Sequence, residues 1–308
     1  MTTAATRLEW LVFLALGFMW GSSYLFIKLA VGSFGTFTLI ALRLLIGAAL
    51  LWLVVLTTRT PLPRDRRVYG HLLVMGVINI TLPFTLITWA EQSVTSALAA
   101  ILNSTVPLMV IVLAPLFLPD EPIRLNGLIG LAVGFCGVVL IVSPGLAGAA
   151  GTVTGQLALL GSSLSYAAGN VYSRRNVRGL PPMIPAVMQV SIALLIVGAL
   201  ALTLERPWET AHPDLLAWFS VVWLGILGSG LAYLAYFRLL SRWGATRTAL
   251  VAYLLPVVGI VLGFLVRQEP IDASLIAGTG LVIAGVALVS GRWGRRRLFA
   301  PSSPVEAA

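Results

Sequence analysis

Charged side chains are scarce in this chain of 308 residues. Asp, Glu, Lys and Arg make up only 10% of it, whereas 58% is hydrophobic and the mean hydropathy is +0.97. An average soluble domain carries about 25% charged residues. A soluble globular protein is therefore excluded. We expect helices that cross a membrane, each of which needs about 20 apolar residues to span the hydrocarbon core.

Cysteine and histidine are nearly absent as well. Cys136 is the only cysteine and lies in an apolar run, so neither a disulfide framework nor a thiolate metal site is expected. His71 and His212 fall at the edge of a run and in a loop, and no zinc-protease, serine-hydrolase or Walker A motif occurs. No aspartate lies inside an apolar run. These absences argue against an enzyme, and we expect no cofactor and no metal.

Apolar runs bounded by charge, proline or glycine follow one another along most of the chain. They predict an all-α polytopic membrane protein with transmembrane helices at residues 10–31, 36–57, 69–90, 94–117, 124–143, 155–174, 182–203, 214–236, 246–267 and 272–291.

Arginine gathers on one side of the predicted membrane. The net charge is +9, but the basic residues lie between apolar runs and not on one amphipathic stripe, so we expect no nucleic-acid partner. Only Lys28, Arg206 and Arg267 fall in connections assigned to the outer side, and Arg43 lies inside a run. The positive-inside rule therefore predicts that both termini are cytoplasmic. The basic residues on the inner side are Arg7, Arg59, Arg64, Arg66, Arg67, Arg124, Arg174, Arg175, Arg178, Arg238, Arg242, Arg247, Arg292, Arg295, Arg296 and Arg297.

The second half of the sequence repeats the first. Glu121-Pro122-Ile123 recurs as Glu269-Pro270-Ile271, Pro107 matches Pro256, and Trp20 matches Tyr166, at offsets of 148, 149 and 146. Each half then holds five spans, an odd number that gives the halves opposite orientations. This is the inverted-repeat plan of secondary transporters, with a site at the midplane. The predicted parts are a first half at 1–143, an outer linker at 144–154, a second half at 155–291 and a basic cytoplasmic tail at 292–308.

Several motifs occur in order over essentially the whole chain. Trp20-Gly21 lies in the first span, Arg43 in the second, Pro107 in the fourth, and Glu-Pro follows spans four and nine. Together they resemble the drug/metabolite transporter superfamily in its ten-helix EamA-type branch, and within it the YddG-type exporters of aromatic and other apolar amino acids. The resemblance implies export, a central cavity walled by spans 1, 3, 4, 6, 8 and 9, and an outer packing pair of spans 5 and 10.

Amides and aromatic rings inside the spans are the candidate substrate-binding groups. An amide exposed to lipid is costly, so each should face protein or a wet cavity. Asn79 with Pro83, Asn103 with Pro107, and Tyr166 with Asn170 are each four residues apart and share a helix face. Interhelical hydrogen bonding is the alternative for any single amide. The predicted substrate-binding residues are Trp20, Asn79, Asn103, Tyr166, Asn170, Tyr233 and Tyr253.

Three prolines are candidate hinges. Pro83, Pro107 and Pro256 each remove a backbone hydrogen bond inside a span, and Pro107 and Pro256 occupy matching positions of the repeat. The alternative is a static kink that neighbouring helices satisfy.

Other polar side chains are assigned structural roles. Arg43 lies about seven residues into its span, and its repeat counterpart is Gln189. We favour bonding of Arg43 to carbonyls at helix ends over substrate contact. Glu91, Glu121 and Glu269 lie at span ends, where we expect water to reach them and local arginines to pair with Glu121 and Glu269. With no carboxylate near the midplane, facilitated export is a simpler expectation than proton antiport.

Small residues recur four apart in spans 5 and 10, namely Gly130 with Gly134 and Gly280 with Ala284. They allow close helix packing, either as scaffold or as a dimer face.

The sequence thus predicts a multi-pass protein of a bacterial inner membrane, monomeric, with a small molecule and the lipid bilayer as its partners. It should export small hydrophobic metabolites, aromatic amino acids above all, by alternating access. An exporter of amphipathic or cationic drugs is the alternative within the class, and a membrane scaffold or sensor is the alternative outside it. Stacking favours aromatic substrates, and the lack of a buried carboxylate argues against cations.

Overall fold

The structure is a computed structural model that describes residues 6–118, 125–146, 150–177, 180–181, 183–243, 248, 251–252 and 254–290. Over these ranges the regular structure is helical and contains no strand. Three segments, labelled η, are π-helical. In chain order the elements are α1 (Arg7–Phe34), α2 (Thr36–Thr57), α3 (Arg66–Gly76), η1 (Val77–Thr81), α4 (Leu82–Ala90), α5 (Ser96–Asn103), α6 (Val106–Phe117), α7 (Leu125–Leu146), α8 (Ala150–Asn176), α9 (Met183–Leu200), η2 (Ala201–Glu205), α10 (Pro207–Thr210), α11 (Leu215–Trp223), η3 (Leu224–Leu231), α12 (Ala232–Trp243), α14 (Leu254–Arg267) and α15 (Ala273–Ser290).

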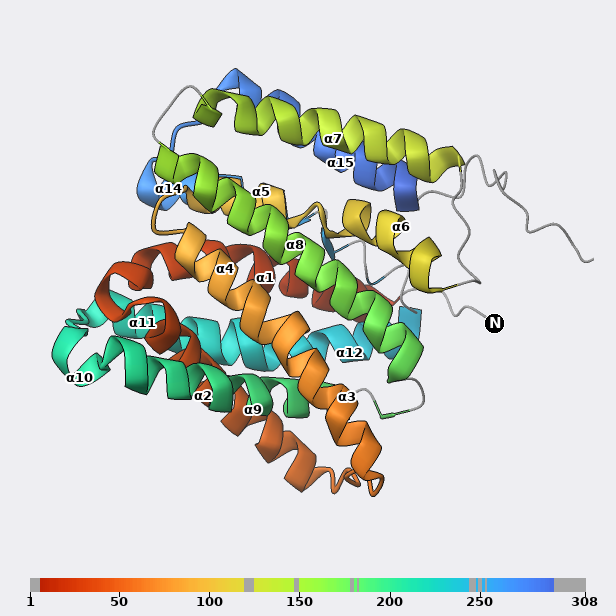
Figure 1. Ribbon diagram of the computed structural model, residues 1–308, viewed down its shortest axis with the longest axis vertical. Helices are drawn as coiled ribbons and strands as arrows, with labels where there is room; N and C mark the ends of the chain where they lie inside the picture. Colours follow the sequence, from red (N-terminus) through yellow and green to blue (C-terminus); the bar gives the residue numbers. More distant parts are fainter. Residues whose placement is uncertain are drawn as a thin grey trace, which may run out of the picture.

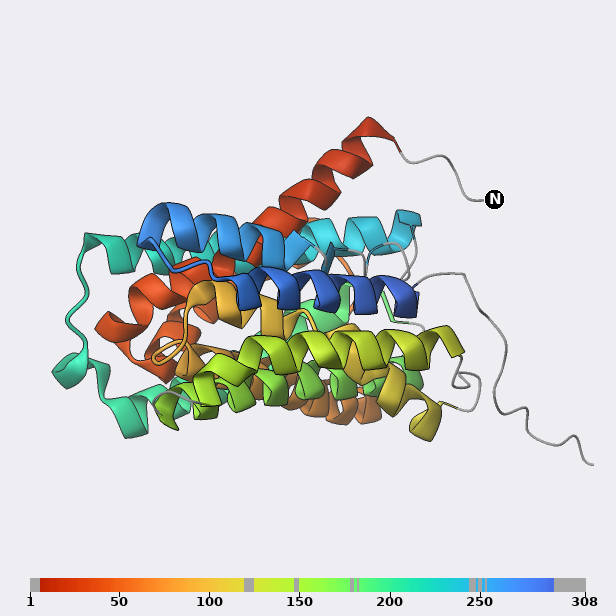
Figure 2. The ribbon, with the colours of Figure 1, turned by 90° about the horizontal axis from the view of Figure 1, so that it is seen from above.

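The long helices lie side by side in one bundle (Figure 1). Helices α7 and α15 form one edge of it, α2, α3 and α9 form the opposite edge, and α1, α4 and α8 pass through the middle. Seen from above, the beginning of α1 leans away from the bundle (Figure 2). Segments from both halves of the sequence therefore surround the centre of the bundle.

The apolar runs of the sequence predict the positions of the helices well. Six continuous helices of the described ranges are long and apolar enough to cross a membrane, and three shorter apolar helices accompany them. The first helix exceeds its predicted range of 10–31, because Thr6 and Glu9 form a capping box that starts it at Arg7. The all-α polytopic fold is confirmed, whereas the number of ten crossings stays a prediction.

The predicted hinge prolines lie where helices begin or change geometry. Pro83 is at the start of α4, directly after the π-helical segment η1. Helix α5 ends at Asn103, and Pro107 lies in the first turn of α6. Pro256 lies in the first turn of α14. A first turn tolerates proline because its N–H groups have no partner within the helix. Movement at these three sites stays a prediction.

Glycines bring the backbones of α7 and α15 into direct contact, as expected for the outer pair. A Cβ atom on Gly137 would lie 2.7 Å from the carbonyl oxygen of Gly278, and one on Gly285 would lie 2.5 Å from the amide nitrogen of Gly134. The predicted spacing was wrong for α15, because Gly280 has open space around it. Gly278 and Gly285 face α7 instead, which is the face that the close approach requires.

Glu269 does not have the water-exposed position that the sequence suggested. Its carboxylate is 7% exposed and accepts hydrogen bonds from the amide nitrogens of Ser96, at 2.9 Å, and Ala97, at 3.0 Å, and from the Ser96 hydroxyl. It therefore caps the N-terminus of α5, where unpaired N–H groups favour an anion, and does not pair with an arginine. Glu121, its counterpart in the repeat, lies outside the described residues.

A second carboxylate, that of Glu205, caps the N-terminus of α2 in the same way. Glu205, at the end of η2, accepts hydrogen bonds from the amides of Phe37, at 2.8 Å, and Thr38, at 2.7 Å, and from the Thr38 hydroxyl. Glu205 and Glu269 belong to the second half of the chain, and each holds the beginning of a helix of the first half. The two halves are thus tied together by charge-assisted hydrogen bonds, which are buried at Glu269 and partly buried at Glu205.

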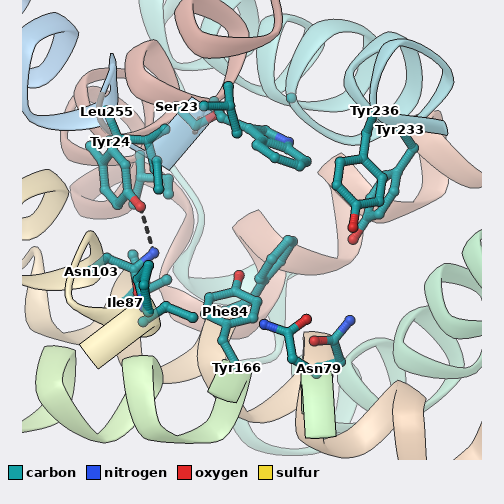
Figure 3. Close-up of a pocket in the computed structure, with 18 of the residues that line it drawn as sticks. Ser23, Tyr24, Asn79, Phe84, Ile87, Asn103, Tyr166, Tyr233, Tyr236 and Leu255 are labelled. Carbon is teal, nitrogen blue, oxygen red and sulfur yellow. Dashed lines mark hydrogen bonds between the residues drawn. The ribbon is translucent and has the colours of Figure 1, made fainter. Parts of the chain in front are cut away.

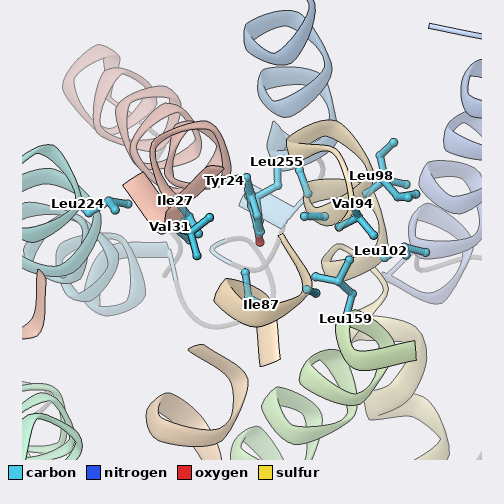
Figure 4. Packing of buried hydrophobic residues seen from close by; sticks show 14 of the residues in the cluster. Tyr24, Ile27, Val31, Ile87, Val94, Leu98, Leu102, Leu159, Leu224 and Leu255 are labelled. Atoms are coloured by element: carbon cyan, nitrogen blue, oxygen red, sulfur yellow. The ribbon is translucent and has the colours of Figure 1, made fainter. Parts of the chain in front are cut away.

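The largest apolar cluster fills the space between α1, α4, α5 and α8 (Figure 4). Its buried members include Ile27 and Val31 of α1, Ile87 of α4, Leu98 of α5 and Leu159 of α8. On α1 the members of the cluster recur every three or four residues, as expected for a helix that buries one face. The cluster borders the cavity described next.

Candidate functional site

A cavity of about 290 Å³ lies within the bundle, where helices of both halves meet (Figure 3). Its wall is mostly apolar and aromatic, with a few amides, hydroxyls and one guanidinium. The residues that line it are Trp20, Ser23, Tyr24, Ile27, Arg43, Asn79, Phe84, Ile87, Asn103, Val106, Pro107, Tyr166, Asn170, Gly228, Tyr233, Tyr236, Thr248, Val251, Ala252 and Leu255.

Most of the predicted binding residues lie in this wall. The structure brings together Trp20, Asn79, Asn103, Tyr166, Asn170 and Tyr233 from five helical segments of the sequence, and Pro107 lies beside them. Tyr253 lies outside the described residues, and Pro83 and Pro256 are buried beneath the wall without lining it. That these side chains contact a substrate stays a prediction.

Sequence reasoning missed several residues of the wall. Tyr24 lies one turn after Trp20 on the same helix, and Tyr236 lies three residues after Tyr233. The helical spacing could have found both of them, because residues three and four apart share a face. Phe84 follows directly after Pro83 and points into the cavity.

Two of the three amides in the wall, Asn79 and Asn103, are bonded to other helices. The Asn103 amide donates to the Tyr24 hydroxyl at 2.6 Å, and its oxygen accepts from the Ser162 hydroxyl at 3.0 Å. The Asn79 amide donates to the Gln189 side chain at 2.8 Å. Gln189 is buried and is not among the described residues that line the cavity, and its structural role stays a prediction. These bonds fix the wall of the cavity.

Asn170 differs from the other amides. Its side chain is exposed to the cavity and makes no hydrogen bond within the described part of the chain. An amide offers two N–H donors and one oxygen acceptor. Asn170 is therefore the amide of the wall that can bind a polar group of a ligand without breaking an existing bond.

Aromatic rings form one side of the cavity. The indole of Trp20 lies with its centroid 5.5 Å from the ring of Tyr236 and 6.4 Å from the ring of Tyr233, in tilted and edge-to-face contacts. Both tyrosines belong to α12 and face the cavity (Figure 3). Rings held in this way offer a rigid apolar surface to another ring.

Arg43 does not make the carbonyl contacts predicted for it. Its side chain is 4% exposed and lies in the cavity wall. Nε donates to the Ser229 hydroxyl at 3.2 Å, and the guanidinium carbon lies 4.4 Å from the centroid of the Phe84 ring. The position allows contact with a molecule in the cavity, which the sequence reasoning had ranked below a structural role.

A second cavity, of about 570 Å³, lies further along α1 and α4. It is more polar and is lined in part by Lys28, Glu91, Gln92 and Glu205. Glu91 was expected to be reached by water, but its side chain is fully buried and neither carboxylate oxygen has a hydrogen-bond partner among the described residues. The Lys28 ammonium donates to the backbone carbonyls of Glu91, at 2.5 Å, and Val94, at 2.8 Å. We refer to it as the outer cavity, after the side to which the arginine pattern assigns Lys28. It shares no described lining residue with the central cavity.

No candidate metal centre emerges from the part of the chain that the structure describes, because no group of three or more His, Cys, Asp and Glu side chains comes together there.

The chain belongs to the EamA-like transporter family, whose profile matches residues 8–143 and again residues 153–291. It is therefore a membrane protein of a transporter class, and the resemblance drawn from Trp20-Gly21, Arg43, Pro107 and the two Glu-Pro motifs is confirmed.

Relatives of similar length bear transporter names. The inner membrane transporter YedA of Escherichia coli K12, named as uncharacterized, is 29% identical over 295 residues, which are 95% of this chain and 92% of YedA. The uncharacterized transporter YvbV of Bacillus subtilis is 28% identical over 277 residues, 88% of each chain. A solved crystal structure also matches 91% of this chain and 95% of its own, with a TM-score of 0.66 and 24% identity, which shows the fold alone.

Proposed function

We propose that this protein is a secondary transporter that exports small hydrophobic metabolites, namely aromatic and other apolar amino acids, by alternating access. One observation carries the proposal: indole and phenol rings and amides from both halves of the chain line a common cavity. Ligand sites in proteins are commonly apolar cavities with a few placed polar groups.

The cavity suits an aromatic substrate in particular. An aromatic side chain can stack against Trp20, Tyr236 and Phe84, and stacking adds about 0.5 to 1.5 kcal/mol to the burial of apolar area. Asn170 can bond to the amino-acid head group. A cationic drug is disfavoured, because the part of the lining that the structure describes contains no carboxylate.

The two cavities support alternating access. On α1, Ile27 lines the central cavity and Lys28 the outer one. On α4, Ile87 lines the central cavity, and Glu91, directly after the end of α4, lines the outer one. Ile27 and Ile87 belong to the apolar cluster that separates the two cavities. Rocking of the halves against each other would part this layer and connect the central cavity with the outer one.

The membrane setting completes the proposal. YedA is named as an inner membrane transporter, and we assign this chain to a bacterial inner membrane as well. The arginine distribution supports ten crossings with both termini in the cytoplasm. We further propose that the protein works as a monomer, because the two halves of the inverted repeat complete the site within one chain.

The test is counterflow of labelled phenylalanine into liposomes that contain the purified full-length protein, with and without a pH gradient. We expect accumulation against preloaded unlabelled phenylalanine in the absence of a gradient. Accumulation no greater than in protein-free liposomes, under both conditions, would refute the proposed substrate class.

A further inference from the structure

Among the described residues that line the central cavity, Arg43 is the one charged side chain. It lies in α2, a helix long and apolar enough to cross the membrane. A guanidinium at such a place is costly and marks a functional position unless a counter-ion accounts for it.

The structure provides no such counter-ion. Arginine has five N–H donors, and here Nε is bonded to the Ser229 hydroxyl, which is neutral. The Phe84 ring covers one face of the guanidinium. Among the described residues no carboxylate forms an ion pair with Arg43, and the Nη1 and Nη2 groups have no hydrogen-bond acceptor. Four of its donors are thus unused.

The unused donors lie at the cavity. Nη2 would be 3.3 Å from a Cβ atom on Gly228, which itself lines the cavity. A side chain at Gly228 would fill the space beside this nitrogen. Glycine leaves the end of the guanidinium accessible from the lumen, next to Ser23 and Phe84.

We propose that Arg43 binds the carboxylate of the transported molecule, and that the substrates are apolar organic carboxylates, with or without an amino group. A carboxylate matches the forked donors of a guanidinium and supplies the missing negative charge in a site of low dielectric constant. The described residues of the cavity wall offer no carboxylate for an ammonium group. The carboxylate therefore dominates recognition, and an amine without a carboxylate is rejected.

This inference rests on the proposed function for the direction of transport. Its claim about ligand recognition, however, can be tested by binding measurements alone. Isothermal titration of the purified full-length protein compares 3-phenylpropionate with 3-phenylpropionamide, which has the same shape and no charge. We expect the wild-type protein to bind the carboxylate more tightly by roughly 10- to 150-fold, the range for hydrogen bonds to charged groups. Phenethylamine should not bind.

Variants separate recognition from packing. Arg43→Gln should bring the two affinities together while leaving that of the amide nearly unchanged, and Arg43→Lys should keep a reduced preference for the carboxylate. Arg206→Gln removes the same charge from an exposed position and should keep the wild-type ratio. A ratio near one in the wild-type protein, or an unchanged ratio in Arg43→Gln, would overturn the inference.

The experiment also distinguishes the two proposals. Should Arg43→Gln fail to fold, the wild-type ratio and the Arg43→Lys variant still decide the question. A protein that prefers the carboxylate but shows no phenylalanine counterflow would refute the proposed function and leave the role of Arg43 intact.

Discussion

Replacing Glu269 by alanine should destabilise the protein strongly, because this carboxylate holds the beginning of α5. The change removes the acceptor of the Ser96 and Ala97 amides, both buried at the N-terminus of the helix. A buried donor without a partner costs about 1 to 3 kcal/mol, so the two amides together cost about 2 to 6 kcal/mol. Glu269→Gln keeps one acceptor oxygen without the charge and should fall between the alanine variant and the wild type.

Thermal unfolding in detergent, followed by tryptophan fluorescence, measures the effect. Glu209→Ala is the control, because Glu209 is an exposed carboxylate at 3.7 Å from Arg206, and such pairs contribute little. We expect midpoints in the order wild type and Glu209→Ala, then Glu269→Gln, then Glu269→Ala. If Glu269→Ala unfolds at the same temperature as Glu209→Ala, the cap is not an important link between the two halves.

Three further predictions follow from the packing and the two cavities. Trp20→Ala and Tyr166→Ala should each weaken phenylalanine counterflow by about two- to tenfold, the equivalent of about 0.5 to 1.5 kcal/mol of stacking. Size-exclusion chromatography should show that both variants remain folded. Normal transport in both variants would mean that these rings only fill space in the core. Gly285→Leu should lower the unfolding midpoint, because the new Cβ atom would meet the α7 backbone. Gly280→Leu should leave the midpoint unchanged, because the space around Gly280 is open. Equal midpoints for the two variants would contradict the contact between α7 and α15. Glu91→Gln should retain counterflow without a pH gradient, because Glu91 lies outside the central cavity, and a collapse of exchange would identify it as a proton carrier.

The helices and the composition of the cavity wall could be predicted from the sequence because both depend on local periodicity. Apolar runs gave the spans, and a spacing of three or four residues gave the faces that carry Asn79, Asn103 and Tyr166. The same rule, applied one turn further from Trp20, would have added Tyr24. What could not be predicted is which partner a polar side chain finds across the bundle.

Glu269 and Arg43 illustrate this limit. Glu269 binds α5 over a separation of 173 residues, and no local pattern indicates such a contact. Its position at the end of a span suggested water and local arginines, although a helix N-terminus is an equally good partner for an anion. Arg43 was expected to bond carbonyls at helix ends, but its partners are a hydroxyl and a ring, and its unused donors become visible only with the cavity.

The central claim is that an aromatic substrate binds in the cavity between the halves. Cross-linking with a photoactivatable phenylalanine analogue, followed by mass spectrometry of the labelled peptides, tests it directly. We predict labels on the α1 segment with Trp20 and Tyr24 or the α12 segment with Tyr233 and Tyr236, and their loss when excess phenylalanine competes. Labels confined to the outer pair α7 and α15, or labels that phenylalanine does not displace, would contradict the claim.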